Sequence, residues 1–230
     1  AYDYLTPGSP FEGFTVKGTA GSAFSLSNNN TSVGSAAVAG TLTSYSGVAH
    51  AGTTYDNRGV WTGTAAGKFT ITNDVYFNNA DQQVNVKTTI TALTDLTGVS
   101  FGRFEDPDAV AATGDSSRTN NFVGATGVPS TDLVYAEALV SKYVIGLYTN
   151  SSTTHNAGIS SAWSPDPGTY LSGTNNGNGD YVIGLGFDIG SLLNGQSIVL
   201  DYAYIFGTNI SAAVSSSGAG GGGGGVPTID

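Results

Sequence analysis

The densest group of acidic side chains lies in the stretch GRFEDPDAVAATGDSSRTNN, which begins at residue 102. Carboxylates that alternate with carbonyl and amide oxygens in a loop can supply the six to eight oxygen ligands that Ca²⁺ prefers. The spacing matches neither an EF-hand nor a nonapeptide calcium repeat. The alternative is that Arg103 and Arg118 pair with these carboxylates and hold the loop in place. Calcium is the one cofactor that the sequence suggests, and its candidate ligands are Glu105, Asp106, Asp108 and Asp115.

Hydrolysis of a polysaccharide is a second chemistry that carboxylates could perform. A glycosidase needs two of them roughly 5–10 Å apart across a cleft, and the candidate pairs in this chain are Glu105 or Glu137 with Asp106 or Asp166. No spacing singles out any of these pairs. The two histidines, His50 and His155, are far apart in the sequence, and there is no G-x-S-x-G elbow or phosphate-binding loop. We therefore expect no enzyme activity.

Sugar binding is the third chemistry, and it rests on aromatic residues. Two stretches rich in Gly, Asn and Asp, YDNRGVWTG and AWSPDPGTYLSGTNNGNGD, contain Trp61, Trp163 and Tyr170. An exposed indole can stack on a pyranose ring while neighbouring amides bond its hydroxyl groups. The alternative is that both tryptophans close the ends of a hydrophobic core.

The elements that position these residues are predicted to be β-strands. KFTITNDVYF and QVNVKTTITAL alternate apolar and polar residues with a period of two, and NNADQ (residues 78–82) separates them. Residues 68–93 therefore predict a long hairpin. Further strands are expected at residues 99–104, 133–139, 142–149, 181–190 and 197–206. Glycines inside several of these strands indicate bulges or a close approach of the second sheet.

This pattern predicts an all-β fold, a two-sheet antiparallel β-sandwich with jelly-roll or Greek-key connections. We expect the sandwich to span residues 1–213, although residues 1–65 are only weakly patterned. Residues 214–230 form a tail or linker that is rich in Ser and Gly. There is no internal repeat at a fixed period, which argues against a β-helix or a propeller.

The composition restricts the cellular location and the binding partners that we expect for this protein. Only 10% of the residues are charged, against about 25% in an average soluble domain, and the net charge is −10. An acidic surface with few cations disfavours both nucleic acid and anionic membranes. The chain has no Cys and no Met, and no apolar run is long enough to insert in a bilayer. We expect a secreted or cell-surface protein whose signal peptide has been removed.

Two stretches resemble sandwich domains of large Gram-negative surface proteins and adhesins. SLLNGQSIVLDYAYIFG resembles their closing strand, and VNVKTTITALTDLTGVSFGRFEDPD resembles the part that precedes it. The glycine run before VPTID is similar to a junction in autotransporter-like proteins. The resemblance covers roughly residues 69–207 and implies a surface-exposed sandwich, without implying any catalytic or binding residue.

The glycine-rich tail and the amino-terminal stretch indicate self-assembly. Polyglycine is by default a flexible linker, but it can also dock as a strand on the open edge of a neighbouring sheet. Non-closing contacts of this kind build filaments. Residues 1–16 could supply the docking strand instead. The candidate assembly residues are Tyr2, Tyr4, Leu5, Phe11, Gly220, Gly221, Gly222, Gly223, Gly224 and Gly225.

We therefore expect an extracellular structural or adhesive protein that forms filaments or a surface layer with copies of itself. The alternative is a carbohydrate-binding module that contacts glycans or a cell surface. The third functional hypothesis is an enzyme that acts on polysaccharides.

Overall fold

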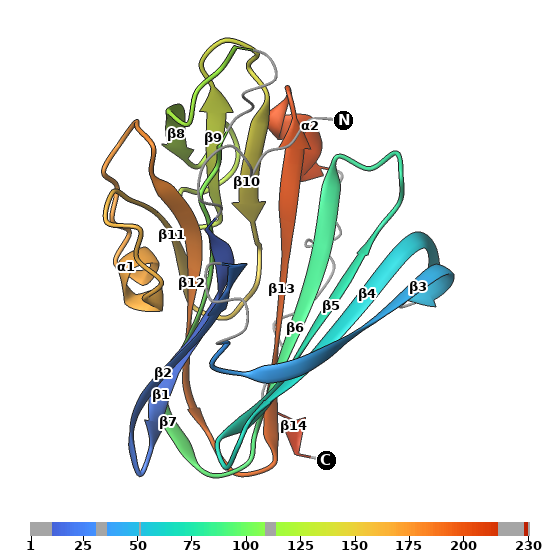
Figure 1. Cartoon of the computed structure of the whole chain (residues 1–230), viewed down its shortest axis with the longest axis vertical. Coiled ribbons are helices and arrows are strands. Elements are labelled where there is room, and N and C mark those ends of the chain that lie inside the picture. The colour runs from blue at the N-terminus through green and yellow to red at the C-terminus, as the bar shows by residue number, and fades with distance from the viewer. Residues whose placement is uncertain (1–10, 31–35, 51, 109–113, 216–227, 230) are drawn as a thin grey trace.

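The chain folds into two antiparallel β-sheets that pack face to face (Figure 1). The computed structural model describes residues 11–30, 36–50, 52–108, 114–215 and 228–229. The smaller sheet has five strands, which in spatial order are β11 (His155–Ser160), β12 (Val182–Leu192), β7 (Leu96–Glu105), β1 (Glu12–Ala20) and β2 (Ser22–Asn29).

The larger sheet has nine strands. Eight of them follow one another in space as β3 (Ala39–His50), β4 (Thr53–Ala65), β5 (Phe69–Phe77), β6 (Gln83–Ala92), β13 (Gln196–Gly207), β10 (Val144–Tyr148), β9 (Leu133–Ala138) and β8 (Thr119–Val123). The ninth, β14 (Thr228–Ile229), pairs with the beginning of β13. The chain crosses repeatedly between the sheets, and the predicted β-sandwich is confirmed.

The strongest sequence pattern produces the central hairpin of the larger sheet. Strands β5 and β6 pair from Phe69↔Ala92 to Tyr76↔Asn85, and the turn between them occupies the predicted residues. Phe69 and Ile71 are fully buried, because alternate side chains of a strand point to the same face. The period-two alternation therefore decides which face of this hairpin meets the smaller sheet.

The main core lies between the two sheets. Phe101 on β7 and Tyr202 on β13 come from opposite sheets, and their ring centroids are 6.1 Å apart. Phe187 on β12 joins them, with centroids 6.1 Å from Phe101 and 6.2 Å from Tyr202. All three side chains are fully buried. These large aromatics set the spacing between the sheets where the sandwich is closed.

A short helix covers the outer face of the smaller sheet. Helix α1 (Pro167–Leu171) begins at Asp166, whose side chain accepts a hydrogen bond from the Gly168 amide. Its Tyr170 lies flat against Gly184 of β12, where an added Cβ would be 2.6 Å from the tyrosine ring. The glycines in the strand VIGLGF therefore leave room for this helix to pack against the sheet. The sequence predicts instead that such glycines mark bulges or a close approach of the second sheet. A second helix, α2 (Ile210–Ser215), follows β13.

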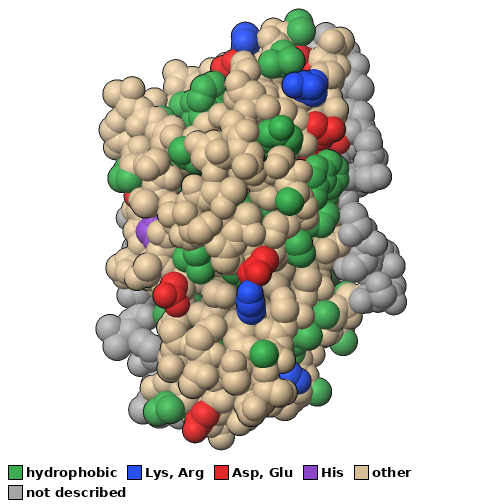
Figure 2. All heavy atoms as spheres, turned by 90° about the vertical axis from the view of Figure 1, so that its left-hand side faces the viewer, with side chains coloured by type: hydrophobic (Ala, Val, Ile, Leu, Met, Phe, Trp, Pro, Cys, Tyr) green, Lys and Arg blue, Asp and Glu red, His purple; other side chains and the backbone are tan. Residues whose placement is uncertain are grey.

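Uncharged groups dominate the face of the molecule that carries α1. Figure 2 shows few Lys, Arg, Asp and Glu side chains on this face, some of them next to a side chain of opposite charge, among uncharged side chains and backbone. This distribution follows from a composition with 10% charged residues. Neither helix of the described chain has the length and apolarity that crossing a membrane requires.

Replacement of Gly186 by alanine tests the close packing of α1 on the sheet. The new Cβ would be 2.7 Å from the Pro167 carbonyl oxygen and 2.8 Å from the Leu171 nitrogen. Because these are backbone atoms, we expect Gly186→Ala to lower the free energy of unfolding by about 1–3 kcal/mol, measured by urea denaturation. The control is Gly59→Ala in β4, whose Cβ would meet only Leu42 Cδ1 at 3.6 Å. Equal effects of the two variants would refute tight packing at α1.

Candidate functional site

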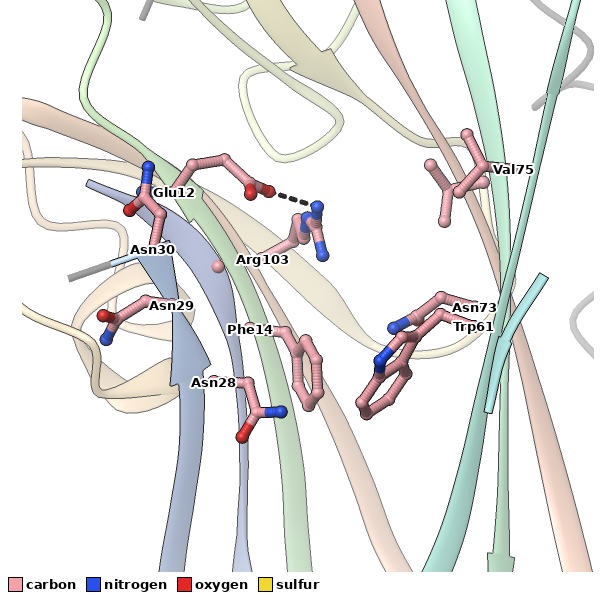
Figure 3. Close-up of a pocket in the computed structure, with 11 residues that line it drawn as sticks. Glu12, Phe14, Asn28, Asn29, Asn30, Trp61, Asn73, Val75 and Arg103 are labelled. Carbon is pink, nitrogen blue, oxygen red and sulfur yellow. Dashed lines mark hydrogen bonds and ion pairs between the residues drawn. The ribbon is translucent and has the colours of Figure 1, made fainter. Parts of the chain in front are cut away.

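Two adjoining hollows open between the sheets on the side of strands β1 to β5. The first, of about 280 Å³, is lined by both sheets (Figure 3). The second, of about 390 Å³, continues over the inner face of β3, β4 and β5. Both hollows are lined by Trp61, Asn73 and Val75. The remaining lining residues of the first are Glu12, Gly13, Phe14, Asn28, Asn29, Asn30, Val86 and Arg103.

The hollows exist because the larger sheet is wider than the smaller one. Strand β2 is the last strand of the smaller sheet, whereas the larger sheet extends to β4 and β3 at its own edge. Leu42 on β3, which is paired with Trp61, is consequently 66% exposed. Figure 1 shows these strands diverging from the smaller sheet. The inner face of the overhanging strands is thus open to a ligand.

Trp61 lies where the two hollows meet, and it lines both of them. Its indole ring lies over two facing glycines, since a Cβ on either Gly40 or Gly63 would be 2.3 Å from a ring atom. Gly40 and Gly63 are directly paired across β3 and β4, so the sheet provides a flat surface for the ring. Phe14 from the opposite sheet meets the indole edge-on, with centroids 5.6 Å apart. The tryptophan is therefore held in one orientation without being fully buried.

Amide side chains supply the polar groups of the first hollow. Asn73 is paired directly with Trp61 across β4 and β5, and its oxygen accepts a hydrogen bond of 2.7 Å from the Thr88 hydroxyl. In Figure 3 the nitrogen of Asn73 points into the hollow. On the facing sheet, Asn28 is fixed by two hydrogen bonds of 2.8 Å to the backbone of Val38. Amides held in this way can donate to and accept from hydroxyl groups.

The charged groups among the lining residues of the first hollow, Glu12 and Arg103, form an ion pair with each other (Figure 3). The Tyr204 hydroxyl completes the group: it accepts from Arg103 Nε and donates to Glu12 Oε1, both at 2.5 Å. Burial acts to lower the pKa of Arg103, but the charge of Glu12 and the interactions with Tyr204 and Tyr202 together outweigh burial, and the pKa rises. Arg103 therefore stays charged, and the hollow carries no net charge from this pair.

A second carboxyl group lies directly behind this ion pair. Glu105 faces Glu12 across β7 and β1, is fully buried, and neither of its oxygens has a hydrogen-bond partner. Burial raises its pKa well above the usual value, the charge of Glu12 adds to this, and Arg103 offsets part of it. The environment thus favours the protonated form of Glu105. It does not line either of the two hollows, so its proton does not reach a ligand there.

The three aromatic residues predicted to bind sugar do not share a site. Trp61 lines the hollows, whereas Trp163 and Tyr170 lie on the other side of the smaller sheet. Tyr170 is fully buried, and its hydroxyl donates to the Ser164 carbonyl at 2.5 Å, so the prediction that it contacts a sugar is wrong. Trp163 packs against Phe11, with ring centroids 5.8 Å apart. Trp163 is thus part of a small second core.

The predicted acidic site is brought together only in part. Asp106 and Asp108 lie near each other, but the third carboxylate is Asp180, which the sequence did not indicate. Glu105 is directed to the opposite face of β7, between the sheets, because neighbouring residues of a strand alternate. Asp115 accepts hydrogen bonds from the backbone nitrogens of Val140 and Ser141. The prediction that Glu105 and Asp115 share one ion with Asp106 and Asp108 is therefore wrong. Arg103 pairs with Glu12 rather than with the carboxylates of this loop.

The other candidate catalytic residues take part in a helix cap or in ion pairs that stabilise the fold. Asp166 caps α1 and pairs with Lys17 at 2.8 Å, and Glu137 pairs with Lys142 at 3.0 Å. His155 Nε2 lies 3.1 Å from Asp132 Oδ1. His50 Nδ1 lies 3.3 Å from Asp74 Oδ2, and burial lowers the pKa of this histidine. The two imidazoles belong to different sheets and do not form one site.

The residues predicted to mediate assembly lie mostly outside the described chain. This holds for Tyr2, Tyr4, Leu5 and the glycines at 220–225. Phe11 is described and packs within its own chain, stacked on Phe104 with ring centroids 4.9 Å apart. It is 8% exposed, so it is not available as an anchor for a second copy in this conformation.

Comparison with known proteins gives no further guide to function. No protein-family model and no curated protein matches this chain. The functional inference therefore depends on the geometry and chemistry of the residues themselves.

Replacement of Glu12 by glutamine tests the ion pair at the back of the hollow. The side chains of Arg103 and Glu12 are 15% and 24% exposed, and Glu12→Gln leaves the guanidinium group without its carboxylate. We expect a loss of about 1–3 kcal/mol in the free energy of unfolding, between the values for exposed and fully buried pairs. The matched control is Glu137→Gln, which removes the more exposed pair with Lys142. A loss in the control as large as in Glu12→Gln would contradict the central role of this pair.

Proposed function

We propose that this protein is an extracellular glycan-binding β-sandwich, and that it binds an uncharged polysaccharide along the hollows on either side of Trp61. The observation that carries this proposal is the position of the Trp61 ring. It lies over Gly40 and Gly63 in an open hollow, with the amide of Asn73 beside it. An aromatic ring next to fixed amides offers both a stacking surface for a sugar ring and partners for its hydroxyl groups.

The electrostatics of the hollow favour an uncharged ligand. Glu12 and Arg103 neutralise each other, and the amide of Asn28 supplies an uncharged polar group on the opposite wall. An anionic ligand would have to compete with Glu12 for Arg103 and would meet a chain of net charge −10. A sugar chain that carries only hydroxyl groups avoids both costs.

The length and openness of the hollows favour a polymer over a single small molecule. The second hollow extends the first over the inner face of β3 to β5, where Leu42 and Phe77 line it. Together the two hollows form a continuous surface on both sides of the indole. A chain of sugar units could therefore cross Trp61 and contact both sheets.

Binding is favoured over hydrolysis because, among the described residues, a single carboxyl group lines this surface. Glycoside hydrolysis uses two carboxyl groups, one on each side of the scissile bond. Glu12 lines the first hollow but is committed to Arg103 and Tyr204, and Glu105 is fully buried behind it. These observations support a binding module with no catalytic step.

Substitution of Trp61 tests the proposal directly. Trp61→Ala removes the stacking surface, and we expect at least a tenfold loss of affinity for a neutral polysaccharide, corresponding to about 1.4 kcal/mol. Affinity gel electrophoresis and calorimetry with soluble β-glucan, xylan and mannan would measure this, with polygalacturonate as the acidic comparison. Trp61→Phe keeps part of the ring and should retain part of the affinity.

The matched control for this experiment is Trp163→Phe, which changes the other tryptophan of the chain. This variant should bind as the original protein does, because Trp163 lies outside both hollows. If Trp61→Phe and Trp61→Ala are both folded and bind every polysaccharide as well as the original protein does, the proposed site is refuted.

Self-assembly is a second candidate function, and the pairing of β14 favours it. Strand β10 pairs with β13 only from Ala203 to Gly207, so the beginning of β13 is uncovered on that side. There the end of the chain adds a short strand, with Ser197↔Thr228 and Gln196↔Ile229. An edge that accepts a terminal segment of its own chain can accept the same segment from another copy.

Truncation tests this second function. A chain ending at Ser215 lacks β14, and we expect it to remain monomeric under conditions in which the complete chain forms oligomers or filaments. Light scattering over a range of concentrations and electron microscopy would distinguish the two. Identical monodisperse particles from both chains would refute assembly through the terminal strand.

A further inference from the structure

Three carboxylates meet at one end of the smaller sheet, on the side away from the hollows. Asp106 directly follows β7, and Asp180 lies just before β12. Because β7 and β12 are antiparallel neighbours, with Glu105 paired to Ile183, the end of one strand lies beside the beginning of the other. Asp108 completes the group, and one carboxylate oxygen from each residue lies within 4.8 Å of the others.

The burial of the Asp106 carboxylate is not explained by hydrogen bonds within the described chain. Asp106 is 1% exposed, and neither of its carboxylate oxygens has a hydrogen-bond partner. Asp180 Oδ1 is also buried without a partner. Burial raises the pKa of Asp106 to about 7, and the charges of Asp108 and Asp180 contribute to the rise. A buried charged group without partners is costly unless an ion or a proton compensates it.

The backbone around the three aspartates is held on both sides. The Asp106 amide donates to the Phe11 carbonyl at 2.7 Å, and the Asp108 amide donates to the Asp106 carbonyl at 3.1 Å. On the other side, Gly179 exchanges two backbone hydrogen bonds with Thr119, at 3.1 and 3.2 Å. These backbone hydrogen bonds hold the chain segments that carry the three carboxylates close together.

We propose that Asp106, Asp108 and Asp180 bind a calcium ion. Two oxygens bound to the same Ca²⁺ are at most about 5 Å apart, since each lies 2.3–2.6 Å from the ion. The separations within 4.8 Å satisfy this limit. The group offers only oxygen atoms, whereas Zn²⁺ prefers nitrogen and sulfur ligands. Mg²⁺ requires shorter bonds and a stricter octahedron, which three carboxylates on separate chain segments are poorly suited to provide.

The ion would join two segments that are distant in sequence. It would offset two of the three negative charges and link the end of β7 to the loop that leads into β12. This loop region also carries Trp163, whose indole nitrogen donates to the Asp180 carbonyl at 3.4 Å. Calcium binding would thus stabilise the outer layer of the smaller sheet, independently of ligand binding at Trp61.

The position of Trp163 provides a direct probe. In the variant Trp61→Phe, Trp163 is the single remaining tryptophan, because the chain has two. Terbium takes the place of calcium in oxygen sites, and an indole beside the site sensitises its luminescence. We expect sensitised terbium emission from Trp61→Phe that calcium displaces and an equal concentration of magnesium does not. Absence of this emission at saturating terbium would overturn the proposal.

Stability measurements with the complete chain provide the second test. At a calcium concentration 100-fold above Kd, we expect Tm to rise by about 5–10 °C. Asp106→Asn and Asp180→Asn should lose this rise, and Asp188→Asn, on the exposed part of β12, should keep it. Without calcium, Asp106→Asn should be at least as stable as the original chain, because it removes an uncompensated buried carboxylate. A metal-free Asp106→Asn that is strongly destabilised, or a calcium response unchanged by it, would show that the group has a structural role only.

Discussion

The contact among Arg103, Glu12 and Tyr204 is the constraint on which the rest of the structure depends. Arg103 and Glu12 belong to neighbouring strands of the smaller sheet, and Tyr204 belongs to β13 of the larger one. The three side chains therefore connect the sheets at the point where the aromatic core ends and the hollow begins. A chain with few charged residues places this ion pair between its sheets, where both side chains are mostly buried. The geometry of the hollow follows from this contact, because it fixes β1 and β7 relative to β13.

The two faces of the smaller sheet serve different purposes. The inner face carries Phe101 into the core and Arg103 to the hollow, whereas the outer face carries Gly102 and Phe104 under the α1 segment. The same alternation separates Glu105 from Asp106, two adjacent acids that end up on opposite sides of the sheet. The proposed glycan surface and the proposed calcium site are thus built by one strand, but they are separated by the thickness of a sheet. Either can fail experimentally without affecting the other.

The part of the fold that could be predicted from the sequence is the part in which apolar and polar residues alternate along the strands. The β5–β6 hairpin and its turn are where the alternation of Phe69, Ile71, Val86 and Ile90 indicates. Strand β4 was missed, because YDNRGVWTG contains glycines and charged residues where an alternating apolar pattern would be expected. Those glycines have a role that appears only in the folded chain, since Gly63 pairs with Gly40 and leaves room for the indole of Trp61.

The candidate sites were less predictable than the fold, because they join residues that are far apart in the sequence. Trp61 could be selected from its type and surroundings, but Glu12, Asn73 and Arg103 meet it only through strand order and register. Tyr170 has the same local signals as Trp61 and is nevertheless buried, because Gly184 allows α1 to pack closely. Asp180 joins Asp106 and Asp108 only because β12 and β7 are neighbours. Loop composition identifies these residue types, whereas pairing between distant strands decides which of them share a site.

The most direct test of glycan binding at Trp61 is an NMR titration that follows the two indole N–H signals and the side-chain amide of Asn73. The probes are soluble neutral oligosaccharides: cellohexaose, laminarihexaose, xylohexaose and mannohexaose. We expect at least one of them to shift the signals of Trp61 and Asn73 in parallel while the Trp163 signal stays unchanged. Saturating concentrations that leave Trp61 unmoved, or that shift Trp163 alone, would contradict the proposed site.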